Sequence, residues 1–394
     1  MQDITAYKFK NKKALIRVDF NVPLNDQYEV TDDTRIKATM PTIKEVLKGG
    51  GSAILMSHLG RPKGAEEKYS LKHVVPALEK ITGKDVIFVS DCIGDEALKA
   101  KKDLAPGEIL LLENLRFYPE EKKGDAEFAK KLAEGADVYV NDAFATAHRA
   151  HASTSIIAAL FGPNKMFGKV MTNEIQHLDK ALNAPKKGYT AIIGGAKVSS
   201  KIIVIEQLLK KVDKLVIGGA MAYTFIKAQG GKVGDSMVEE EYIDTAKKVM
   251  EAAAKNDTEI ILPVDSVNGD AFKADANTQV TPADAIEAGW MGMDIGPETL
   301  TRLGDIISKS KTILWNGPVG VFEMEKFARG TFGIAQMIAD ATGKGLYSLV
   351  GGGDSVSALN KSGLANEVSY VSTGGGAMLE YIEGKKLPGI AAIG

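Results

Sequence analysis

Positively charged and polar side chains follow the short apolar runs in the first half of this 394-residue chain. In order they are Arg17, Asp19, Asn21, His58, Arg61, Arg116, Asn141, Asp142, His148, Arg149 and His151. Guanidinium groups bind phosphate and carboxylate oxygens through paired hydrogen bonds. The first half is therefore expected to bind a small, highly charged anion. Taken alone, His148 and His151 would be interpreted as core histidines, and no cysteine or carboxylate near them has zinc-site spacing.

Glycines take the corresponding places in the second half of the chain. They are Gly194-Gly195, Gly218-Gly219, Gly317 with Gly320, Gly351-Gly352-Gly353 and Gly374-Gly375-Gly376. A glycine turn that enters a helix lets backbone N–H groups approach phosphate oxygens, and the helix dipole adds attraction. One such pair after a strand is usually only a tight turn. Five glycine turns in one half favour a polyphosphate nucleotide as the ligand of that half.

Lys197 and Lys201 follow the first of these glycine turns and are four residues apart. Apolar residues at helical spacing come next, so the pattern predicts a helix with both ammonium groups on one side of its first turns. Cations near a helix N-terminus are unfavourable by about 0.3–1 kcal/mol. A bound phosphate would remove this penalty, and a solvated lysine face explains the spacing equally well.

Two acidic residues of the second half stand near glycine turns. Asp354 would serve as a helix N-cap, which is the usual role of an aspartate after a glycine turn. It would equally suit Mg²⁺ on nucleotide phosphates, because this ion accepts one or two carboxylates and keeps its waters. Glu323, considered alone, would be an exposed loop acid.

Several common phosphate-binding motifs are absent. The sequence has no Walker A motif, no G-x-G-x-x-G and neither the H-R-D nor the D-F-G of protein kinases. The usual dinucleotide fingerprint and the protein-kinase set are therefore excluded, and the nucleotide hypothesis depends on a less generic arrangement of glycines.

Eleven short apolar runs alternate with segments of helical periodicity, such as 125–134 and 239–254. The runs are 14–18, 53–56, 86–89, 109–112, 138–140, 191–193, 215–217, 260–262, 312–315, 348–350 and 368–371. Continuous apolar strands between helices predict parallel sheets that are covered on both faces. This number of units exceeds one ordinary open sheet, so an α/β fold with two domains is expected. An eight-fold barrel would leave several units unused.

Bulk composition points to an ordinary cytoplasmic protein. The formal net charge of −2 gives no reason to propose nucleic acid or an acidic membrane as a partner. The first ten residues lack the apolar stretch of a signal peptide, and no apolar run is long enough to span a bilayer. The single cysteine, Cys92, excludes an intramolecular disulfide and fits a reducing compartment.

Motifs along nearly the whole chain resemble those of the phosphoglycerate kinase family. They are LIRVDFNVP (15–23), SHLGRP (57–62), LENLRF (112–117), TAHRAH (146–151), GGAKVSSK (194–201), WNGPVGVFE (315–323), GGGDS (351–355) and STGGGA (372–377). The resemblance implies two doubly wound, Rossmann-like parallel-sheet domains joined by a hinge. A 3-phosphoglycerate domain would comprise 1–170 with the C-terminal tail 384–394, and a nucleotide domain 171–383.

The resemblance also implies a role for each matching residue of the substrate domain. That domain would bind 3-phosphoglycerate or 1,3-bisphosphoglycerate through Asp19, Phe20, Asn21, Arg35, His58, Leu59, Gly60, Arg61, Arg116 and Arg149. Asp19 and Asn21 would hold the hydroxyl and carboxylate end, while His58 and the arginines other than Arg35 grip the phosphate. Arg35 would meet the transferring phosphoryl group.

In the nucleotide domain the implied contacts to ATP or ADP are Lys197, Lys201, Gly292, Glu323, Gly352, Gly353, Asp354 and Ser355. Lys201 would follow the phosphoryl group as it is transferred. Lys197 and Lys201 would act with Arg35 as the catalytic residues. Glu323 would accept hydrogen bonds from the ribose, and Asp354 would position the Mg²⁺ of the magnesium nucleotide. Gly292 with Met293 would flank the adenine.

The implied activity is a reversible phosphoryl transfer of glycolysis and gluconeogenesis, from ATP to 3-phosphoglycerate, carried out by a hinge-bending monomer. The transition state is loose and places charge on equatorial oxygens, so positioning and cations supply most of the catalysis. The acceptor is a carboxylate that is already deprotonated, so no general base is required, and none stands out in the sequence.

Two alternatives belong to other classes. A non-catalytic phospholigand-binding protein would be favoured by loss of Arg35, Lys201 or Asp354, all of which are present. A dinucleotide-dependent dehydrogenase would need the missing glycine fingerprint.

The chain departs from the family pattern at two positions. Ala145 stands where many members have glycine, and Tyr370 stands where many have histidine. The carboxylate–imidazole contact with Glu174 that the family resemblance implies at the hinge therefore lacks its imidazole.

Overall fold

The computed structural model describes residues 3–394. It consists of two compact units, one made of Met1–Ile175 with Lys386–Gly394 and the other of Gln176–Lys385. These are called unit 1 and unit 2 below. The division between them falls inside the helix α6 (Lys169–Leu182), which runs on without a break. The domain limits expected from the sequence were 170 and 384.

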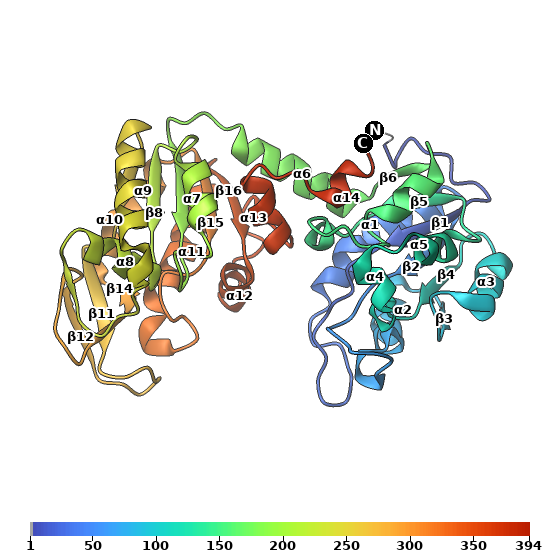
Figure 1. Ribbon diagram of the computed structural model, residues 1–394, viewed down its shortest axis with the longest axis horizontal. Coiled ribbons are helices and arrows are strands. Elements are labelled where there is room, and N and C mark those ends of the chain that lie inside the picture. The colour runs from blue at the N-terminus through green and yellow to red at the C-terminus, as the bar shows by residue number, and fades with distance from the viewer. Residues whose placement is uncertain (1–2) are drawn as a thin grey trace. The chain divides into compact units, whose positions relative to one another are not determined.

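Unit 1 is built on a six-stranded sheet with the order β3-β4-β2-β1-β5-β6, in which every pair is parallel (Figure 1). The strands are β1 (Lys13–Arg17), β2 (Ser52–Met56), β3 (Val86–Val89), β4 (Ile109–Leu112), β5 (Val138–Asn141) and β6 (Lys165–Phe167). The main helices are α1 (Thr34–Lys48), α2 (Val75–Thr82), α3 (Gly94–Asp103), α4 (Pro119–Lys123) and α5 (Ala126–Ala133). The central strands β2 and β4 are buried along their whole length, because helices cover both faces of the sheet.

The C-terminal segment of the chain packs on unit 1. Its short helix α14 (Pro388–Ala391) lies beside β6 in Figure 1. The N–H of Gly389 donates to the carbonyl of Ala147 at 2.8 Å, and Lys165 Nζ donates to the carbonyl of Ala392 at 2.7 Å. A Cβ on Gly389 would stand 2.9 Å from the Cα of Ala147, so this close approach requires glycine.

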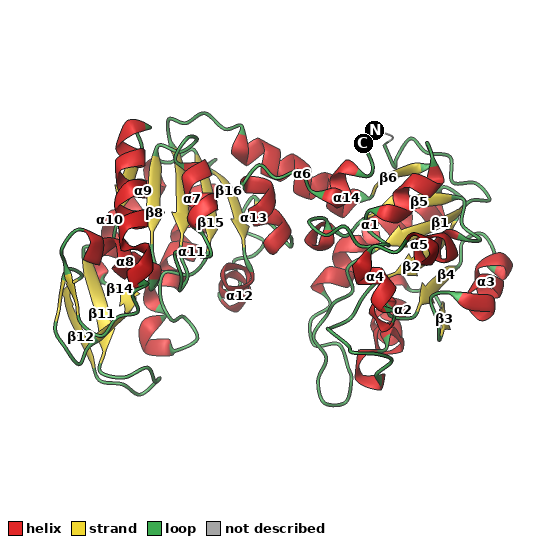
Figure 2. Ribbon diagram, in the orientation of Figure 1, coloured by secondary structure: helices red, strands yellow, loops and turns green. Residues whose placement is uncertain are grey.

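Unit 2 repeats the same architecture, with a second sheet flanked by helices (Figure 2). This sheet has six parallel strands in the order β10-β8-β7-β15-β16-β17. The strands are β7 (Tyr189–Ile193), β8 (Lys214–Ile217), β10 (Glu259–Ile261), β15 (Thr312–Asn316), β16 (Tyr347–Gly351) and β17 (Tyr370–Val371). The helices are α7 (Ile202–Leu208), α8 (Met221–Ala228), α9 (Ile243–Lys255), α10 (Pro297–Lys309), α11 (Arg329–Thr342), α12 (Gly353–Lys361) and α13 (Gly376–Ile382).

The fold class predicted from the sequence is confirmed, and all eleven apolar runs are strands of the two sheets. The prediction omitted the short strand β6 and a smaller antiparallel sheet in unit 2. That sheet has the order β12-β11-β14 and comprises β11 (Asp265–Gly269), β12 (Thr278–Pro282) and β14 (Met291–Ile295). It also omitted the pair β9 (Lys232–Val233) and β13 (Ala285–Ile286). These strands are very short or rich in polar residues, so they are not apolar runs. Among the described residues, no helix is both long and apolar enough to cross a membrane.

Candidate functional site

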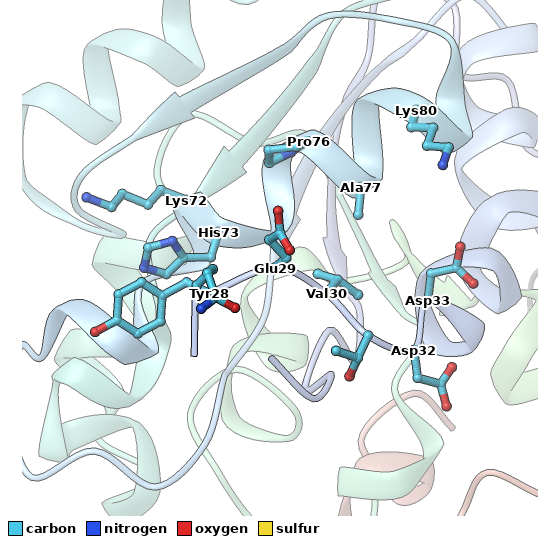
Figure 3. A pocket seen from close by; sticks show the side chains of 12 residues that line it. Tyr28, Glu29, Val30, Asp32, Asp33, Lys72, His73, Pro76, Ala77 and Lys80 are labelled. Atoms are coloured by element: carbon cyan, nitrogen blue, oxygen red, sulfur yellow. The ribbon is translucent and has the colours of Figure 1, made fainter. Parts of the chain in front are cut away.

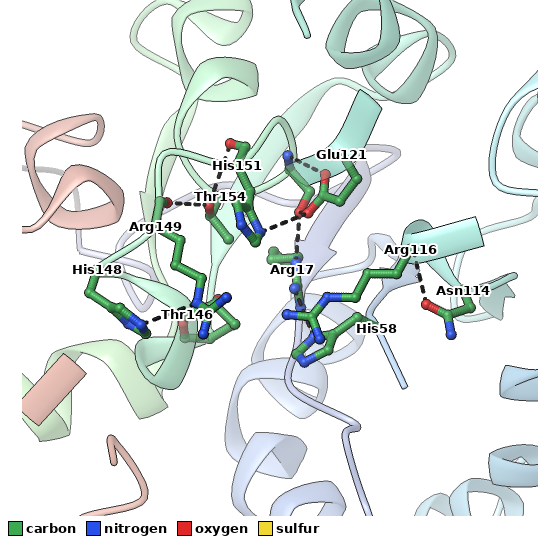
Figure 4. A network of polar contacts seen from close by, with 12 residues as sticks. Arg17, His58, Asn114, Arg116, Glu121, Thr146, His148, Arg149, His151 and Thr154 are labelled. Carbon is green, nitrogen blue, oxygen red and sulfur yellow. Dashed lines mark hydrogen bonds and ion pairs between the residues drawn. The ribbon is translucent and has the colours of Figure 1, made fainter. Parts of the chain in front are cut away.

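Arg17 ends β1 and is the buried centre of a polar network in unit 1 (Figure 4). Its side chain is 1% exposed, its Nε donates to Ser153 Oγ at 2.8 Å, and its guanidinium also contacts the carbonyl of Val18. Its Nη2 lies 3.1 Å from Nδ1 of His58, the second residue after β2. Three partners therefore fix the orientation of this guanidinium.

His58 is a buried, neutral imidazole. Burial lowers its pKa well below the usual value, and the neighbouring positive charges, Arg17 foremost, lower it further. An arginine can only donate, so Nδ1 of His58 accepts the hydrogen bond from Arg17. The ring proton is therefore on Nε2, and one tautomer of His58 is selected by Arg17.

The loop after β1 is tied to the loop after β2 by the expected substrate residues. The N–H of Gly60 donates to Asn21 Oδ1 at 2.8 Å, and the N–H of Phe20 donates to Ser57 Oγ at 2.8 Å. From the first turn of α1, Arg35 forms an ion pair with Asp19. The structure thus brings the first three members of the expected substrate set together and places Arg35 beside them.

Arg116 approaches the same group from the turn after β4. Its Nη1 donates to the carbonyl of Gly60 at 2.7 Å, while its buried Nε has no hydrogen-bond partner among residues 3–394. Burial, with repulsion from Arg17 and Arg149, lowers the pKa of Arg116 to about 10. Asn114 supports the neighbouring backbone by donating to the carbonyl of Leu59 at 2.8 Å. An anion would relieve both the repulsion and the unmet hydrogen bond.

Two further arginines of the expected set are exposed. Arg149 Nε donates to His148 Nε2 at 3.1 Å, and the hydroxyl of Thr154 donates to the carbonyl of Arg149 at 2.9 Å. Arg61 follows Gly60 directly, and its side chain has no hydrogen bond or ion pair within the described part of the chain. Both are therefore accessible to a ligand from solvent.

In unit 2 the glycines that follow the strands differ in whether a Cβ would collide with a neighbouring atom. A Cβ on Gly194 would stand 2.1 Å from the carbonyl oxygen of Pro318, and one on Gly317 would stand 2.2 Å from that of Gly194. These glycines let the loops after β7 and β15 pack against each other. For Gly195 and Gly353, in contrast, an added Cβ would have no atom of the described residues within 4 Å, apart from its own chain neighbours. Only glycines of this second group leave open space above the backbone, as a phosphate cradle requires.

The prediction that a helix includes Lys197 and Lys201 in its first turns was wrong about where the helix begins. The helix α7 begins at Ile202, so Lys201 is its N-cap residue and Lys197 lies in the preceding turn. That turn is held by Ser199, whose hydroxyl and N–H both donate to Glu239, at 2.6 and 3.0 Å. The hydrogen bonds of Ser199 and the preceding glycines thus favour a turn here over the helix that the apolar spacing predicted.

Lys201 is nevertheless directed to the carboxyl end of the sheet, where its Nζ contacts Asn316 Oδ1 at the end of β15. Burial lowers the pKa of Lys201, and the nearby charge of Asp354 opposes this effect. Asn316 also donates from Nδ2 to the carbonyl of Gly351 at 2.9 Å. Ser355 Oγ accepts a hydrogen bond of 2.6 Å from the N–H of Gly317. Lys197 stays exposed.

Asp354 does not act as a helix cap. The N-cap position of α12 is taken by Gly352, which has φ +94° and no side-chain cap, and Asp354 lies exposed in the first turn. A single carboxylate beside open glycine backbone suits Mg²⁺ held mainly by nucleotide phosphates. Among the described residues there is no cluster of three or more His, Cys, Asp or Glu side chains that could hold a metal by themselves.

The expected adenine and ribose residues come from two other elements. Gly292 and Met293 belong to β14 of the antiparallel sheet, and Glu323 is exposed in the loop after β15. The N–H of Val321 donates to the carbonyl of Met293 at 2.8 Å, which joins that loop to β14. A Cβ on Gly292 would collide with Tyr223 Oη at 1.8 Å, so close packing requires this glycine.

Residues 2–385 match the family model named phosphoglycerate kinase. The chain belongs to the phosphoglycerate kinase family. The cytosolic phosphoglycerate kinase of Triticum aestivum is 52% identical over 384 residues, covering 98% of this chain and 96% of the relative. The phosphoglycerate kinase of Porphyromonas gingivalis is 50% identical, covering 99% of each chain. The structure of phosphoglycerate kinase from Coxiella burnetii matches with a TM-score of 0.89 and 41% identity, covering 99% of this chain and 97% of that one. The family predicted from the motifs is confirmed.

Two cavities of unit 1 differ in their relation to this kinase's expected site. One of about 240 Å³ is lined by Asn21, Leu59 and Gly60 together with Tyr69, so it adjoins the expected substrate residues. Another of about 780 Å³ lies between segment 27–33 and α2 and includes none of them (Figure 3).

Sequence reasoning missed the side chains that support the expected site residues. Asn114 supports the backbone at Leu59 and Asn316 contacts Lys201, and both asparagines lie in motifs that resemble the family. Glu121 and Ser153, which hold Arg17, had no such signal, because neither lies in a quoted motif and they are 32 residues apart.

Proposed function

We propose that unit 1 binds 3-phosphoglycerate, that unit 2 binds the magnesium nucleotide, and that the γ-phosphoryl group of ATP passes to the substrate carboxylate. Family membership supports the reaction, whose products are ADP and 1,3-bisphosphoglycerate. The observation that supports the assignment of the units is the contrast between their strand ends. Unit 1 presents repelling guanidinium groups with a buried unpaired N–H, whereas unit 2 presents open glycine backbone with one lysine and one carboxylate.

In unit 1 different residues would bind the two ends of 3-phosphoglycerate. Arg116 and Arg149 bind the phosphate, because a dianion offsets their mutual repulsion. Asn21 and Asp19 hold the hydroxyl and carboxylate end. Arg35, now paired with Asp19, exchanges that partner for the transferring phosphoryl group and stabilises the charge that develops on its oxygens.

In unit 2 Lys201 would bind the phosphate that is being transferred. Its partner Asn316 is neutral, so the ammonium charge is available to a phosphate oxygen. Asp354 holds the Mg²⁺ of the nucleotide, and this ion neutralises charge on the phosphate oxygens. The acceptor is a carboxylate, so the chain needs no base to deprotonate it.

Closure of the two units around their ligands would exclude water from the γ-phosphoryl group. Each substrate alone should shift the open–closed equilibrium weakly, and the pair should shift it strongly. Small-angle X-ray scattering of the free protein, each binary complex and an unreactive ternary complex tests this. Compaction should be greatest in the ternary complex, and identical scattering in all four states would exclude closure. We further propose a monomer in the cytoplasm, in keeping with the cytosolic relatives.

A coupled assay with ATP and 3-phosphoglycerate tests the reaction, and calorimetry on full-length variants tests the assignment of the units. Arg116→Ala should lose 3-phosphoglycerate binding and keep the magnesium nucleotide, whereas Lys201→Met should do the reverse. Arg302→Ala removes an exposed arginine on α10 and should keep both ligands. If Arg116→Ala binds 3-phosphoglycerate normally, unit 1 is not the phosphoglycerate site.

A further inference from the structure

We infer that Glu121 is a positioning residue for the phosphoglycerate site, because its buried carboxylate orients Arg17 through Ser153 and thereby selects the tautomer of His58. The inference rests on the proposed function of unit 1. Glu121 touches none of the expected substrate residues directly and acts through two others (Figure 4).

Both carboxylate oxygens of Glu121 accept hydrogen bonds from Ser153. Glu121 lies in the five-residue helix α4, and its side chain is 1% exposed. Its Oε2 accepts from the N–H of Ser153 at 2.9 Å, and its Oε1 accepts from the hydroxyl of Ser153 at 2.6 Å. The carbonyl of Glu121 also accepts from the N–H of Ala152 at 2.9 Å. Carboxylate and backbone together therefore hold the segment 152–153 against α4.

The direction of each hydrogen bond in this chain of contacts is fixed. A serine hydroxyl has one proton, and Ser153 donates it to the carboxylate of Glu121. Ser153 Oγ is then free to accept from Arg17 Nε at 2.8 Å. The guanidinium, held in this plane, donates from Nη2 to Nδ1 of His58. A negative charge at Glu121 thus determines, through three hydrogen bonds, which nitrogen of His58 carries the proton.

Charge balance supports the same role. Arg17 is buried beside Arg116 and His151, and the pKa of each of these groups is lowered by burial first and by the charge of Arg17 next. A buried guanidinium needs a compensating anion. Among the described residues Arg17 forms no direct ion pair, and the carboxylate of Glu121 is one hydroxyl away. His151 does not neutralise the negative charge of Glu121. Burial lowers the pKa of His151 to about 4, so its imidazole is neutral, and its Nδ1 lies 3.8 Å from Glu121 Oε1.

Glu121→Gln keeps the shape of the side chain and breaks this arrangement. If the amide oxygen accepts from the serine hydroxyl, the amide nitrogen faces the N–H of Ser153, which is also a donor. If the amide is reversed, its nitrogen and Arg17 both donate to Ser153 Oγ, and the serine proton loses its acceptor. Either orientation removes a hydrogen bond, so Arg17 should lose its fixed contact with His58.

The test combines kinetics with nitrogen NMR of the histidines in the full-length protein. Glu121→Gln should raise KM for 3-phosphoglycerate about tenfold, the effect of one charge-assisted hydrogen bond. Its kcat and KM for ATP should stay within about twofold. Two-bond ¹H–¹⁵N spectra should show only the Nε2–H tautomer of His58 in the wild type and a mixture in the variant. Glu120→Gln, a neighbouring substitution on the same helix, should change neither measurement.

Ser153→Ala provides the second arm, because it removes the hydroxyl and leaves the bond from the backbone N–H to Glu121. It should reproduce the tautomer mixture and the KM effect, and the double variant should be no worse than either single one. Equal rises in both KM values with a lowered melting temperature, or an unchanged His58 spectrum in both variants, would overturn the inference. The spectra do not depend on turnover, so an inactive wild type would refute the proposed function without affecting the tautomer result.

Discussion

Gly60 joins two residues of the expected phosphoglycerate site, and replacing it by alanine should disturb both. Its N–H donates to Asn21 Oδ1 and its carbonyl accepts from Arg116 Nη1. Its φ of +64° is left-handed, and a Cβ would stand 2.3 Å from Cε1 and 2.5 Å from Cδ1 of the Tyr69 ring. Gly60→Ala therefore combines an unfavourable backbone conformation with a collision.

The two effects can be separated with a second glycine of unit 1. Gly83, after α2, has φ +68°, and within residues 3–394 no atom beyond its chain neighbours would lie within 4 Å of an added Cβ. Gly83→Ala should lose about 1 kcal/mol of unfolding free energy for the left-handed conformation alone. Overpacking adds about 1–3 kcal/mol at Gly60. The ring of Tyr69 is half-buried and can move in part, so a total loss of about 2–3 kcal/mol is expected for Gly60→Ala.

Urea unfolding followed by far-UV circular dichroism measures these losses. Both tryptophans, Trp290 and Trp315, belong to unit 2, so their fluorescence provides a separate record of the unit that is not mutated. Gly60→Ala should also raise KM for 3-phosphoglycerate about tenfold, since both neighbouring contacts shift. KM for ATP should not change, and Gly83→Ala should leave both values unaltered. Equal stability losses in the two variants, or an unchanged KM in Gly60→Ala, would refute this reasoning.

Three further predictions each concern one side chain. Arg35→Ala should lower kcat by about 10³–10⁵-fold with little change in either KM, because an arginine on the transferring group stabilises the transition state most; a kcat within threefold of wild type and a raised KM would make it a binding residue only. Asp354→Asn should raise the Mg²⁺ concentration needed for half-maximal activity without lowering the melting temperature, since Gly352 occupies the N-cap; an unchanged Mg²⁺ titration would contradict the metal role. Burial raises the pKa of Asp142 in the folded state to about 7, from 3.8. The folded state therefore binds the extra proton, and its stability should fall as pH rises from about 4 to 7 and then level off. Asp142→Asn should remove this slope in urea midpoints, and equal slopes would count against it.

The sequence predicted the parallel sheets well because their strands are buried on both faces. Such strands are continuous apolar runs, and β4, with four buried residues, is an example. The strand β12 could not be recognised in this way, since its residues alternate between exposed and half-buried and it ends in proline. The division between the units was equally hidden, because it falls inside the unbroken helix α6 and not in a linker of distinctive composition.

Within the site, residue types were easier to predict than their partners. The chemistry of Arg17 and His58 follows from their places at the end of β1 and just after β2. Glu121 lies in the run Pro-Glu-Glu-Lys-Lys, which has the composition of a solvated helix. Only the structure shows that its side chain is buried and bonded to Ser153. Lys197 was placed on a helix because the apolar spacing was visible, whereas the Ser199–Glu239 contact that holds its turn spans 40 residues. Long-range contacts of this kind leave no local pattern.

The two units would hold phosphate by different physical means, and this explains where supporting residues are needed. Guanidinium groups near a sheet edge lose hydration, so a buried one such as Arg17 must be oriented and balanced by further buried groups, here Ser153 and Glu121. Backbone N–H groups carry no net charge and need only open space, which Gly195 and Gly353 provide. Substitutions far from the ligand should therefore weaken phosphate binding more often in unit 1. In unit 2 the sensitive positions should be the glycines themselves.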